Sequence, residues 1–317
     1  MFGFIKMLQR IISKLKSNKR LWFTSIFIIS VSGIGLSLFM LISTTNRIAK
    51  EVYNSEVKQF DLRYKDLEKL KEKRLQKLAV LASLNHTIME KLEKNDTNGI
   101  LELENEINAK IVEKEKDLLA FKFYMTQNSA EVLRPSLVTA VQTKNVIFGV
   151  EVLPDGLFYV YLLPIEKDNK VIGVIEARES IYSLKDSFSR LNQQCVVLLD
   201  VKMLPMLSLQ NRDGLYQDVG KNYLINNKAY DNATLGLITS IDDISLRKIA
   251  MGEYVVNKES FFNGMIMRDS NGVEIGLVIM GESINKEGGF INMTQKMTQQ
   301  VIAIALGLIV SLLLFLF

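Results

Sequence analysis

The stretch of sequence that decides the fold is residues 146–177, which read VIFGVEVLPDGLFYVYLLPIEKDNKVIGVIEA. It holds three short runs rich in β-branched and aromatic residues, separated by the turn signals Pro154-Asp155-Gly156 and Lys167-Asp168-Asn169. Runs of this kind, bounded by such clusters, are typical of strands joined by hairpins. The sequence therefore predicts a three-stranded antiparallel meander, with strands at Val146–Val152, Leu157–Leu163 and Val171–Ala177.

Part of this hairpin recurs later in the chain. Val171-Ile172-Gly173-Val174-Ile175 follows a polar turn, and so does Glu274-Ile275-Gly276-Leu277-Val278. A helical patch at Ser180–Gln193 leads into the second set of strands, which starts at Cys195–Val201. The order long helix, sheet, helix, sheet, helix favours two related modules in tandem, with their boundary between Arg190 and Cys195. The predicted fold class is α+β, with a long N-terminal helix and two antiparallel-sheet modules.

A long helical pattern precedes the first strand. Apolar residues recur at helical spacing over Arg47–Lys94 without a proline, and charged residues fill the other faces, which predicts one long amphipathic helix. Asn95–Gly99 supplies turn and cap residues before a second periodic stretch, Ile100–Leu118. A helix of that length is not covered by a small domain. Its apolar stripe predicts a parallel homodimer, with packing on its own domain as the alternative.

Two uncharged runs flank this region. Leu21–Ser43 has no ionisable side chain and, at about 1.5 Å per helical residue, is long enough to cross about 30 Å of hydrocarbon. Val301–Phe317 is also uncharged and stands at the lower length limit for a span. We expect both to be transmembrane helices. No cleavage signal follows the first run, which is therefore expected to be an uncleaved anchor.

Six basic residues and no acidic residue precede the first run: Lys6, Arg10, Lys14, Lys16, Lys19 and Arg20. The positive-inside rule then predicts a two-pass protein of the bacterial cytoplasmic (inner) membrane, with its N-terminus in the cytoplasm and its central domain periplasmic or extracellular. The tail is expected to lie on the inner leaflet, or alternatively to be disordered. Without these six, 33 of the 39 basic residues remain against 35 acidic ones, so the charge does not indicate nucleic-acid binding.

The predicted organisation follows from these patterns. Its segments are a cytoplasmic basic tail (1–20), transmembrane helix 1 (21–43), the long helix and helical return (44–119), a membrane-distal module (120–193), a membrane-proximal module (194–283), an exit helix (284–300) and transmembrane helix 2 (301–317).

Several motifs resemble those of a known family. An aromatic-x-aromatic strand, a Leu-Arg element, a Gly-x-Glu strand, a Pro-Ile hairpin and a Gly-Val-Ile-Glu strand follow one another. They read Phe121-Lys122-Phe123-Tyr124, Leu133-Arg134-Pro135, Gly149-Val150-Glu151, Leu163-Pro164-Ile165 and Ile172-Gly173-Val174-Ile175-Glu176. This arrangement, over roughly 47–300, resembles the double Cache sensory domains of bacterial chemoreceptors and sensor histidine kinases. The resemblance implies two PAS-like modules on a long helix that emerges from the membrane, and a small-molecule ligand.

The chain also departs from that family. The segment between Arg134 and Val146 lacks the acidic helix start of this branch. The amino-acid-binding pattern of other double Cache domains, an Arg followed by Trp-Tyr, is absent, which argues against free amino acids as ligands. No HAMP, kinase, cyclase or methyl-accepting region follows the second run. The output is therefore expected from another chain or from a region beyond Phe317.

The candidate ligand-binding residues are Phe123, Tyr124, Arg134, Glu151, Tyr159 and Tyr161. Arg134 leads because its fork can grip a carboxylate with two parallel hydrogen bonds; an internal ion pair with Glu131 or Glu151 is the alternative. Tyr159 and Tyr161 alternate along a strand, so both hydroxyls share one face, as a pocket wall or as ordinary packing. Phe123 is equally well explained as core, and Glu151 as exposed.

An enzyme is not predicted. His86, the single histidine, falls within the long helix, far in sequence from Cys195 and from any acid partner in the sheets, and Cys195 is expected to be buried and inert. Neither metal-ligand spacing nor a phosphate-binding glycine pattern is present, so no metal or cofactor is expected.

The predicted function is a membrane-anchored sensor that binds a small ligand, such as a carboxylate, and transmits a signal across the membrane as a chemoreceptor-like or split-receptor subunit. Ligand binding would shift the helix that leads to the second span by about 1–2 Å. The alternative is a scaffold or assembly protein of an envelope complex, without a small-molecule ligand; an extracytoplasmic part of a transporter complex is a third possibility.

Overall fold

The computed structural model describes residues 19–115, 119–125, 134–257, 259–285 and 289–316. The chain divides into two compact units. The terminal unit comprises Met1–Ser55 and Glu287–Phe317, and the central unit comprises Glu56–Lys286. The prediction of a membrane-bound basic tail falls mostly on residues 1–18, which lie outside the described residues.

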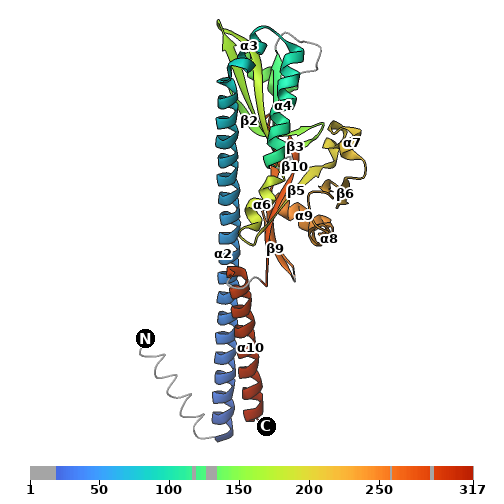
Figure 1. The fold of residues 1–317 in the computed structure, drawn as a ribbon. Coiled ribbons are helices and arrows are strands. Elements are labelled where there is room, and N and C mark those ends of the chain that lie inside the picture. Colours follow the sequence, from blue (N-terminus) through green and yellow to red (C-terminus); the bar gives the residue numbers. More distant parts are fainter. Residues whose placement is uncertain (1–18, 116–118, 126–133, 258, 286–288, 317) are drawn as a thin grey trace. The chain divides into compact units, whose positions relative to one another are not determined.

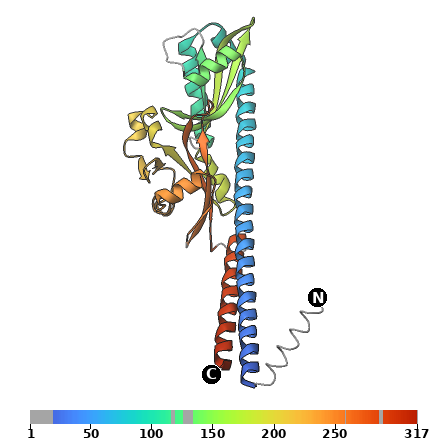
Figure 2. The same cartoon turned by 180° about the vertical axis from the view of Figure 1, so that it is seen from behind.

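The described part of the terminal unit consists of helices. The first part of α2 (Lys19–Ser83) runs beside α10 (Phe290–Leu316) in both Figure 1 and Figure 2, and Leu38 and Ala305 are buried. The run 21–43 lies within α2, and the run from 301 lies within α10 as far as residue 316. Among the described residues, no helix combines the length and the apolar character needed to cross a membrane.

The long helix ends earlier than its periodicity predicts. α2 stops at Ser83, and α3 (His86–Glu93) begins after Asn85. The Asn85 side-chain oxygen accepts hydrogen bonds from the backbone N–H groups of Thr87 at 2.9 Å and Ile88 at 3.4 Å. Asparagine is a preferred N-cap, so it starts a new helix here and the prediction of one helix to residue 94 is wrong at this point. The predicted return is confirmed as α4 (Thr97–Glu115).

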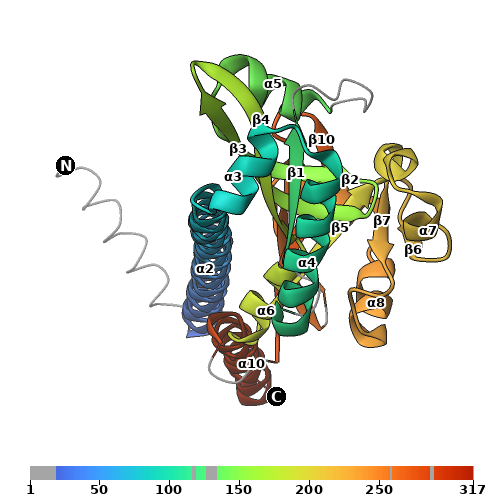
Figure 3. The ribbon, with the colours of Figure 1, turned by 45° about the horizontal axis from the view of Figure 1, so that its top comes forward.

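The first module contains the predicted meander. Its strands are β1 (Leu119–Met125), β2 (Ile147–Leu153), β3 (Gly156–Lys167) and β4 (Lys170–Ser180). They form an antiparallel sheet in the order β1-β4-β3-β2, which confirms the three predicted strands as neighbours. α4 packs along β1 at the edge (Figure 3), where Asn108 of α4 exchanges hydrogen bonds with the Phe121 backbone at 2.7 and 2.8 Å. α5 (Pro135–Thr143) covers one face of this sheet.

The second module has a larger antiparallel sheet, ordered β6-β7-β5-β10-β9-β8. Its strands are β5 (Gln194–Asp200), β6 (Tyr216–Val219), β7 (Tyr223–Asn226), β8 (Val255–Val256), β9 (Ser260–Arg268) and β10 (Glu274–Ser283). Its helices are η1 (Val201–Met206), α7 (Leu209–Arg212), α8 (Asn232–Thr239) and α9 (Asp243–Ala250), and α6 (Ser183–Ser189) connects the modules. A hydrophobic core fills the space between this sheet and the helices α8 and α9.

The repeated motif occupies equivalent places in the two sheets. β4 pairs with the first strand of its module, β1, and β10 pairs with the first strand of its own, β5. A Cβ on Gly173 would lie 2.8 Å from the carbonyl oxygen of Tyr124, and one on Gly276 would lie 2.1 Å from that of Leu198. Both strands therefore need a glycine where the neighbouring backbone comes close. The predicted α+β class, with a long N-terminal helix and antiparallel sheets, is confirmed.

Candidate functional site

The two faces of the first sheet have different neighbours. Residues that pair directly across antiparallel strands share a face, and successive residues on one strand alternate between faces. Lys122 pairs with Glu176, and Glu151 pairs with Phe158, on the face that α5 covers. Val150 pairs with Tyr159 on the opposite face, which lies against α2. Polar side chains from β1, β2 and β4 gather on the α5 face.

Arg134 joins three of these side chains. It is the N-cap residue of α5, with Pro135 next in the first turn, so the helix start holds its backbone in an extended conformation. Its Nε lies 3.0 Å from Oε2 of Glu151, and its Nη2 contacts Oε2 of Glu176. The Tyr124 hydroxyl donates to the same Glu176 oxygen at 3.2 Å.

Arg178 completes the group from the other side. Its Nη1 lies 3.8 Å from Oε1 of Glu176, its Nη2 lies 2.6 Å from Oδ2 of Asp155, and its guanidinium stacks over the Phe158 ring at 4.8 Å. Tyr124, Arg134, Glu151, Glu176 and Arg178 are called the charge cluster below. Glu176 has no exposed surface, and its Oε1 has no hydrogen-bond partner in the described structure.

The surroundings shift the pKa values of Glu151, Tyr124 and Arg134. Burial raises the pKa of Glu151 above its usual value, although the positive charge of Arg134 opposes that shift. Burial also raises the pKa of Tyr124, and the negative charge of Glu176 adds to the effect. Tyr124 is therefore a protonated hydrogen-bond donor at neutral pH. The pKa of Arg134 is lowered by burial but raised more by Glu176 and Glu151 together, so the guanidinium stays charged.

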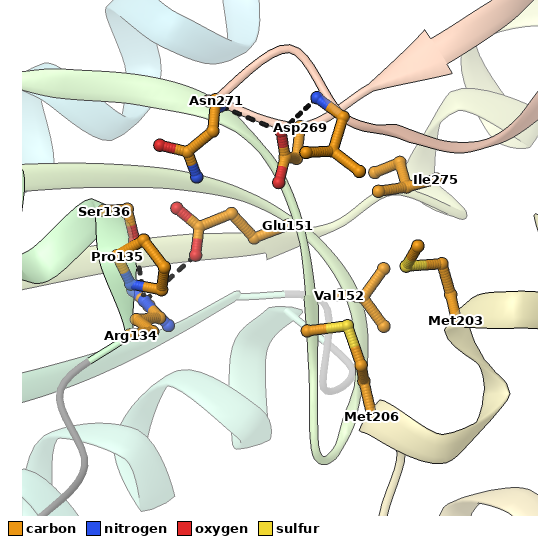
Figure 4. Close-up of a pocket in the computed structure, with 11 residues that line it drawn as sticks. Arg134, Pro135, Ser136, Glu151, Val152, Met203, Met206, Asp269, Asn271 and Ile275 are labelled. Atoms are coloured by element: carbon orange, nitrogen blue, oxygen red, sulfur yellow. Dashed lines mark hydrogen bonds and ion pairs between the residues drawn. The ribbon is translucent and has the colours of Figure 1, made fainter.

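A cavity of about 250 Å³ borders the cluster at the seam between the two modules (Figure 4). Arg134, Ser136 and Glu151 form a polar end, and Met203 and Met206 of η1 face it from the second module. The other lining residues are Pro135, Val152, Asp269, Asn271, Val273 and Ile275. The cavity therefore presents both charged groups and an apolar wall, the combination that small-molecule sites use for orientation and affinity.

The structure brings together half of the predicted site residues. Tyr124, Arg134 and Glu151 meet in the charge cluster, and Arg134 forms the ion pair with Glu151 that the alternative interpretation expected. Glu131 lies outside the described residues. Glu176 closes the Gly-Val-Ile-Glu motif but was not predicted as a site residue, and Arg178 was not singled out from the sequence. The two charged residues stand two positions apart in β4, which places them on one face of the strand.

Phe123, Tyr159 and Tyr161 lie on the opposite face. The Tyr159 hydroxyl donates to that of Tyr64 of α2 at 3.3 Å, and Phe123 is buried and stacks with Phe121. The hydroxyls of Tyr159 and Tyr161 do share a face, as predicted, but that face packs on the long helix. None of these three residues lines the cavity, although Tyr159 pairs with Val150, the neighbour of Glu151 on β2.

His86 and Cys195 both lie outside the charge cluster and the cavity lining. The His86 side chain is 92% exposed at the start of α3, 3.9 Å from Glu90. Burial raises the pKa of the Cys195 thiol. Among the described residues, no three His, Cys, Asp or Glu side chains gather in a way that could hold a metal ion.

Comparison with known proteins found matches among solved structures only: no protein-family model and no curated protein matches the chain. The ligand-binding domain of a Campylobacter jejuni chemoreceptor, solved with 4-methylisoleucine, is 15% identical, with a TM-score of 0.39 over 78% of this chain and 96% of that one. The extracellular domain of a putative histidine kinase is 11% identical, with a TM-score of 0.41 over 78% and 98%. The ligand-binding domain of a Pseudomonas fluorescens chemoreceptor, in complex with L-serine, is 10% identical, with a TM-score of 0.39 over 75% and 99%.

These likenesses are distant. The structures they name are ligand-binding domains of two chemoreceptors and the extracellular domain of a putative histidine kinase.

Proposed function

We propose that the chain is an extracytoplasmic sensor that binds a small ligand at the charge cluster and the adjoining cavity. The observation that carries this proposal is Glu176, a fully buried carboxylate with one oxygen lacking a hydrogen-bond partner among the described residues. A buried charged acceptor left unsatisfied is costly, and native proteins contain few such groups. A ligand that donates a hydrogen bond would satisfy it.

Carboxylates and amines are the two ligand classes to distinguish. Nε and Nη2 of Arg134 already contact Glu151 and Glu176, so a carboxylate that binds through either nitrogen displaces one of these glutamates. Arg134 then keeps its ion pair with one glutamate and exchanges the other for an ion pair with the ligand. The buried guanidinium therefore never loses its compensating charge. We propose a small carboxylate, with a donor group for Glu176, as the first class to test.

A thermal-shift screen of the chain with small carboxylates, amines, purines and sugars tests the proposal. A ligand present at about a hundred times its dissociation constant stabilises its protein by about 2.7 kcal/mol. For a unit of about 150–250 residues this is a rise in Tm of roughly 5–11 °C. The rise should vanish in Arg134→Ala and persist in Arg212→Ala, which removes an arginine paired with its neighbour Asp213. Equal shifts in both variants would place the ligand elsewhere.

We propose that the runs 21–43 and 301–317 anchor the sensor in the bacterial cytoplasmic membrane, with the central unit outside. The uncharged length of the runs and the basic residues before the first run support this orientation. Cys195 is the single cysteine, so Cys195→Ala with Asn98→Cys provides a unique probe. A membrane-impermeant maleimide should label that cysteine in intact cells. Labelling only after lysis would place the central unit inside.

We propose that the sensor works as a homodimer through α2 and passes its signal, without catalysis, to an output partner in another chain or in a region beyond Phe317. Large apolar side chains along α2 of the central unit remain exposed: Leu62 at 62%, Leu70 at 61% and Leu81 at 65%. Such a stripe favours a protein partner. Leu70→Cys, in the Cys195→Ala background, should form a disulfide-linked dimer on oxidation. Exclusively monomeric protein would contradict the homodimer.

The same exposed stripe favours the alternative, an envelope scaffold. In that case α2 would contact a different protein, and the charge cluster would be structural only. Failure of the whole ligand library, together with capture of a membrane partner that Leu70→Glu abolishes, would favour the scaffold.

A further inference from the structure

The second module contacts the ligand site of the first through the turn between β9 and β10. Asp269–Val273, called the seam turn, lies against β2, where Asp269 forms a parallel bridge with Val150. A Cβ on Gly149 would lie 3.0 Å from the Ser270 Cβ and 3.1 Å from its Cα. A larger residue at 149 would push the turn away, so the glycine permits the close packing.

Glu151 is shared between the two modules. Its Oε2 lies 3.0 Å from Nε of Arg134, and its Oε1 accepts a hydrogen bond from the Ser270 hydroxyl at 3.3 Å. The Glu151 side chain is 9% exposed, and the Ser136 hydroxyl of the first module also bonds to it. A single carboxylate therefore links the arginine of the ligand site to the seam turn.

The seam turn is internally braced. One carboxylate oxygen of Asp269 accepts hydrogen bonds from the backbone N–H groups of Asn271 at 2.9 Å and Val273 at 2.8 Å (Figure 4). The Asp269 N–H donates to the Val273 carbonyl at 2.9 Å. β10 starts directly after the turn and lies between β5 and β9. Because β10 continues directly from this turn, a change in the turn's hydrogen bonds would reach the strand whose sequence leads on to α10.

We propose that Ser270 is a positioning residue of the ligand site, supplied by the second module, and that the Arg134–Glu151–Ser270 chain reports the state of Arg134 to β10. This inference rests on the proposed function. A ligand that takes Arg134 from Glu151 releases one oxygen of that carboxylate. Glu151 then reorients, its bond with Ser270 changes, and the seam turn loosens or shifts.

Amide hydrogen exchange of the full chain tests the link without a ligand. Arg134→Ala removes the ion pair between Arg134 and Glu151, as ligand binding is proposed to do. It should speed exchange in the seam turn by about twofold or more, which corresponds to the low end of couplings between residues in one hydrogen-bond network, about 0.5 kcal/mol. In a Ser270→Ala background, Arg134→Ala should add nothing further there. If Arg134→Ala does not fold, Arg134→Lys serves, because it also loses the fork that holds both glutamates.

Two controls isolate the path. Asn211 makes another contact across the seam, donating to the Pro154 carbonyl at 3.2 Å, but it does not touch Glu151. In an Asn211→Ala background, Arg134→Ala should still accelerate exchange in the seam turn. Lys167→Ala removes a charge of the first module that pairs with Glu93, and should leave the turn unchanged.

The inference would be overturned if Arg134→Ala left amide exchange in the seam turn unchanged. It would also be overturned if Arg134→Ala sped that exchange equally in the wild-type and Ser270→Ala backgrounds. The ligand screen is scored separately. If Arg134→Ala abolishes ligand binding but does not change exchange in the seam turn, the proposed sensor function stands and the Arg134–Glu151–Ser270 link is refuted. If Arg134→Ala speeds exchange in the seam turn but the screen finds no ligand, the link stands and the result counts against the proposed sensor function.

Discussion

Glu176→Ala should destabilise the central unit by about 3 kcal/mol. Removing one partner of a buried ion pair costs about 3–5 kcal/mol, because the remaining charge stays buried without compensation. Glu176 is 0% exposed and contacts Arg134, Tyr124 at 3.2 Å and Arg178 at 3.8 Å. The low end of the range applies, since Arg134 keeps Glu151 at 3.0 Å and Arg178 keeps Asp155 at 2.6 Å.

Thermal unfolding followed by circular dichroism measures this loss. At roughly 2–4 °C per kcal/mol for a unit of this size, Tm should fall by roughly 6–12 °C. Glu176→Gln keeps the side-chain volume and an acceptor for Tyr124, so its Tm should fall by less. Glu106→Ala removes an exposed acid that pairs with Lys110 and should leave Tm close to the wild-type value. If Glu176→Ala unfolded at the temperature of this control, the reasoning that the cluster is a buried, mutually dependent network would be refuted.

Three further predictions use the same assay. Asn85→Ala removes the cap of α3 and should cost about 1 kcal/mol, with Asn98→Ala unchanged as the comparison. Glu179→Ala leaves Lys71 of α2 without its buried partner, so a loss of about 3 kcal/mol is expected, and a loss below about 1 kcal/mol would contradict a buried pair. Because burial raises the pKa of Glu151 above 4.5, the folded state binds that proton more tightly than the unfolded state does. Wild-type stability should therefore fall relative to Glu151→Gln as the pH rises from 4.5 through the raised pKa and then level off, whereas parallel Tm–pH curves would disprove the shift.

Much of the fold could be predicted because it depends on local periodicity. The alternation in residues 146–177 and its two turn signals predict β2, β3 and β4 within a few residues, apart from the ends of the longer β3 and β4. Gly173 and Gly276 identified the repeated hairpin, since each marks the strand that the first strand of its module approaches. The break at Asn85 was missed because a capping side chain competes with a helical pattern that continues across it.

The site was predictable only in part. Arg134 and Glu151 were singled out by motif and chemistry, and their pairing was foreseen as an alternative. Glu176 was noted only as the end of a motif, because a glutamate in a strand gives no sign of its partners until the strand register is known. In the sheet, Glu176 pairs with Lys122 on the face of Tyr124, and Arg134 reaches it from the start of α5.

The sequence by itself determined the α+β class, the order of the strands along the chain and the residues that share each face of a strand, because these follow from spacing of two or 3.6 residues. Only the tertiary structure decided which face meets α2 and which meets α5. Periodicity states that Tyr159 and Glu176 lie on definite faces of their strands, but not which layer covers each face. The same holds for Ser270, whose contact with Glu151 depends on how the sheets of the two modules pack.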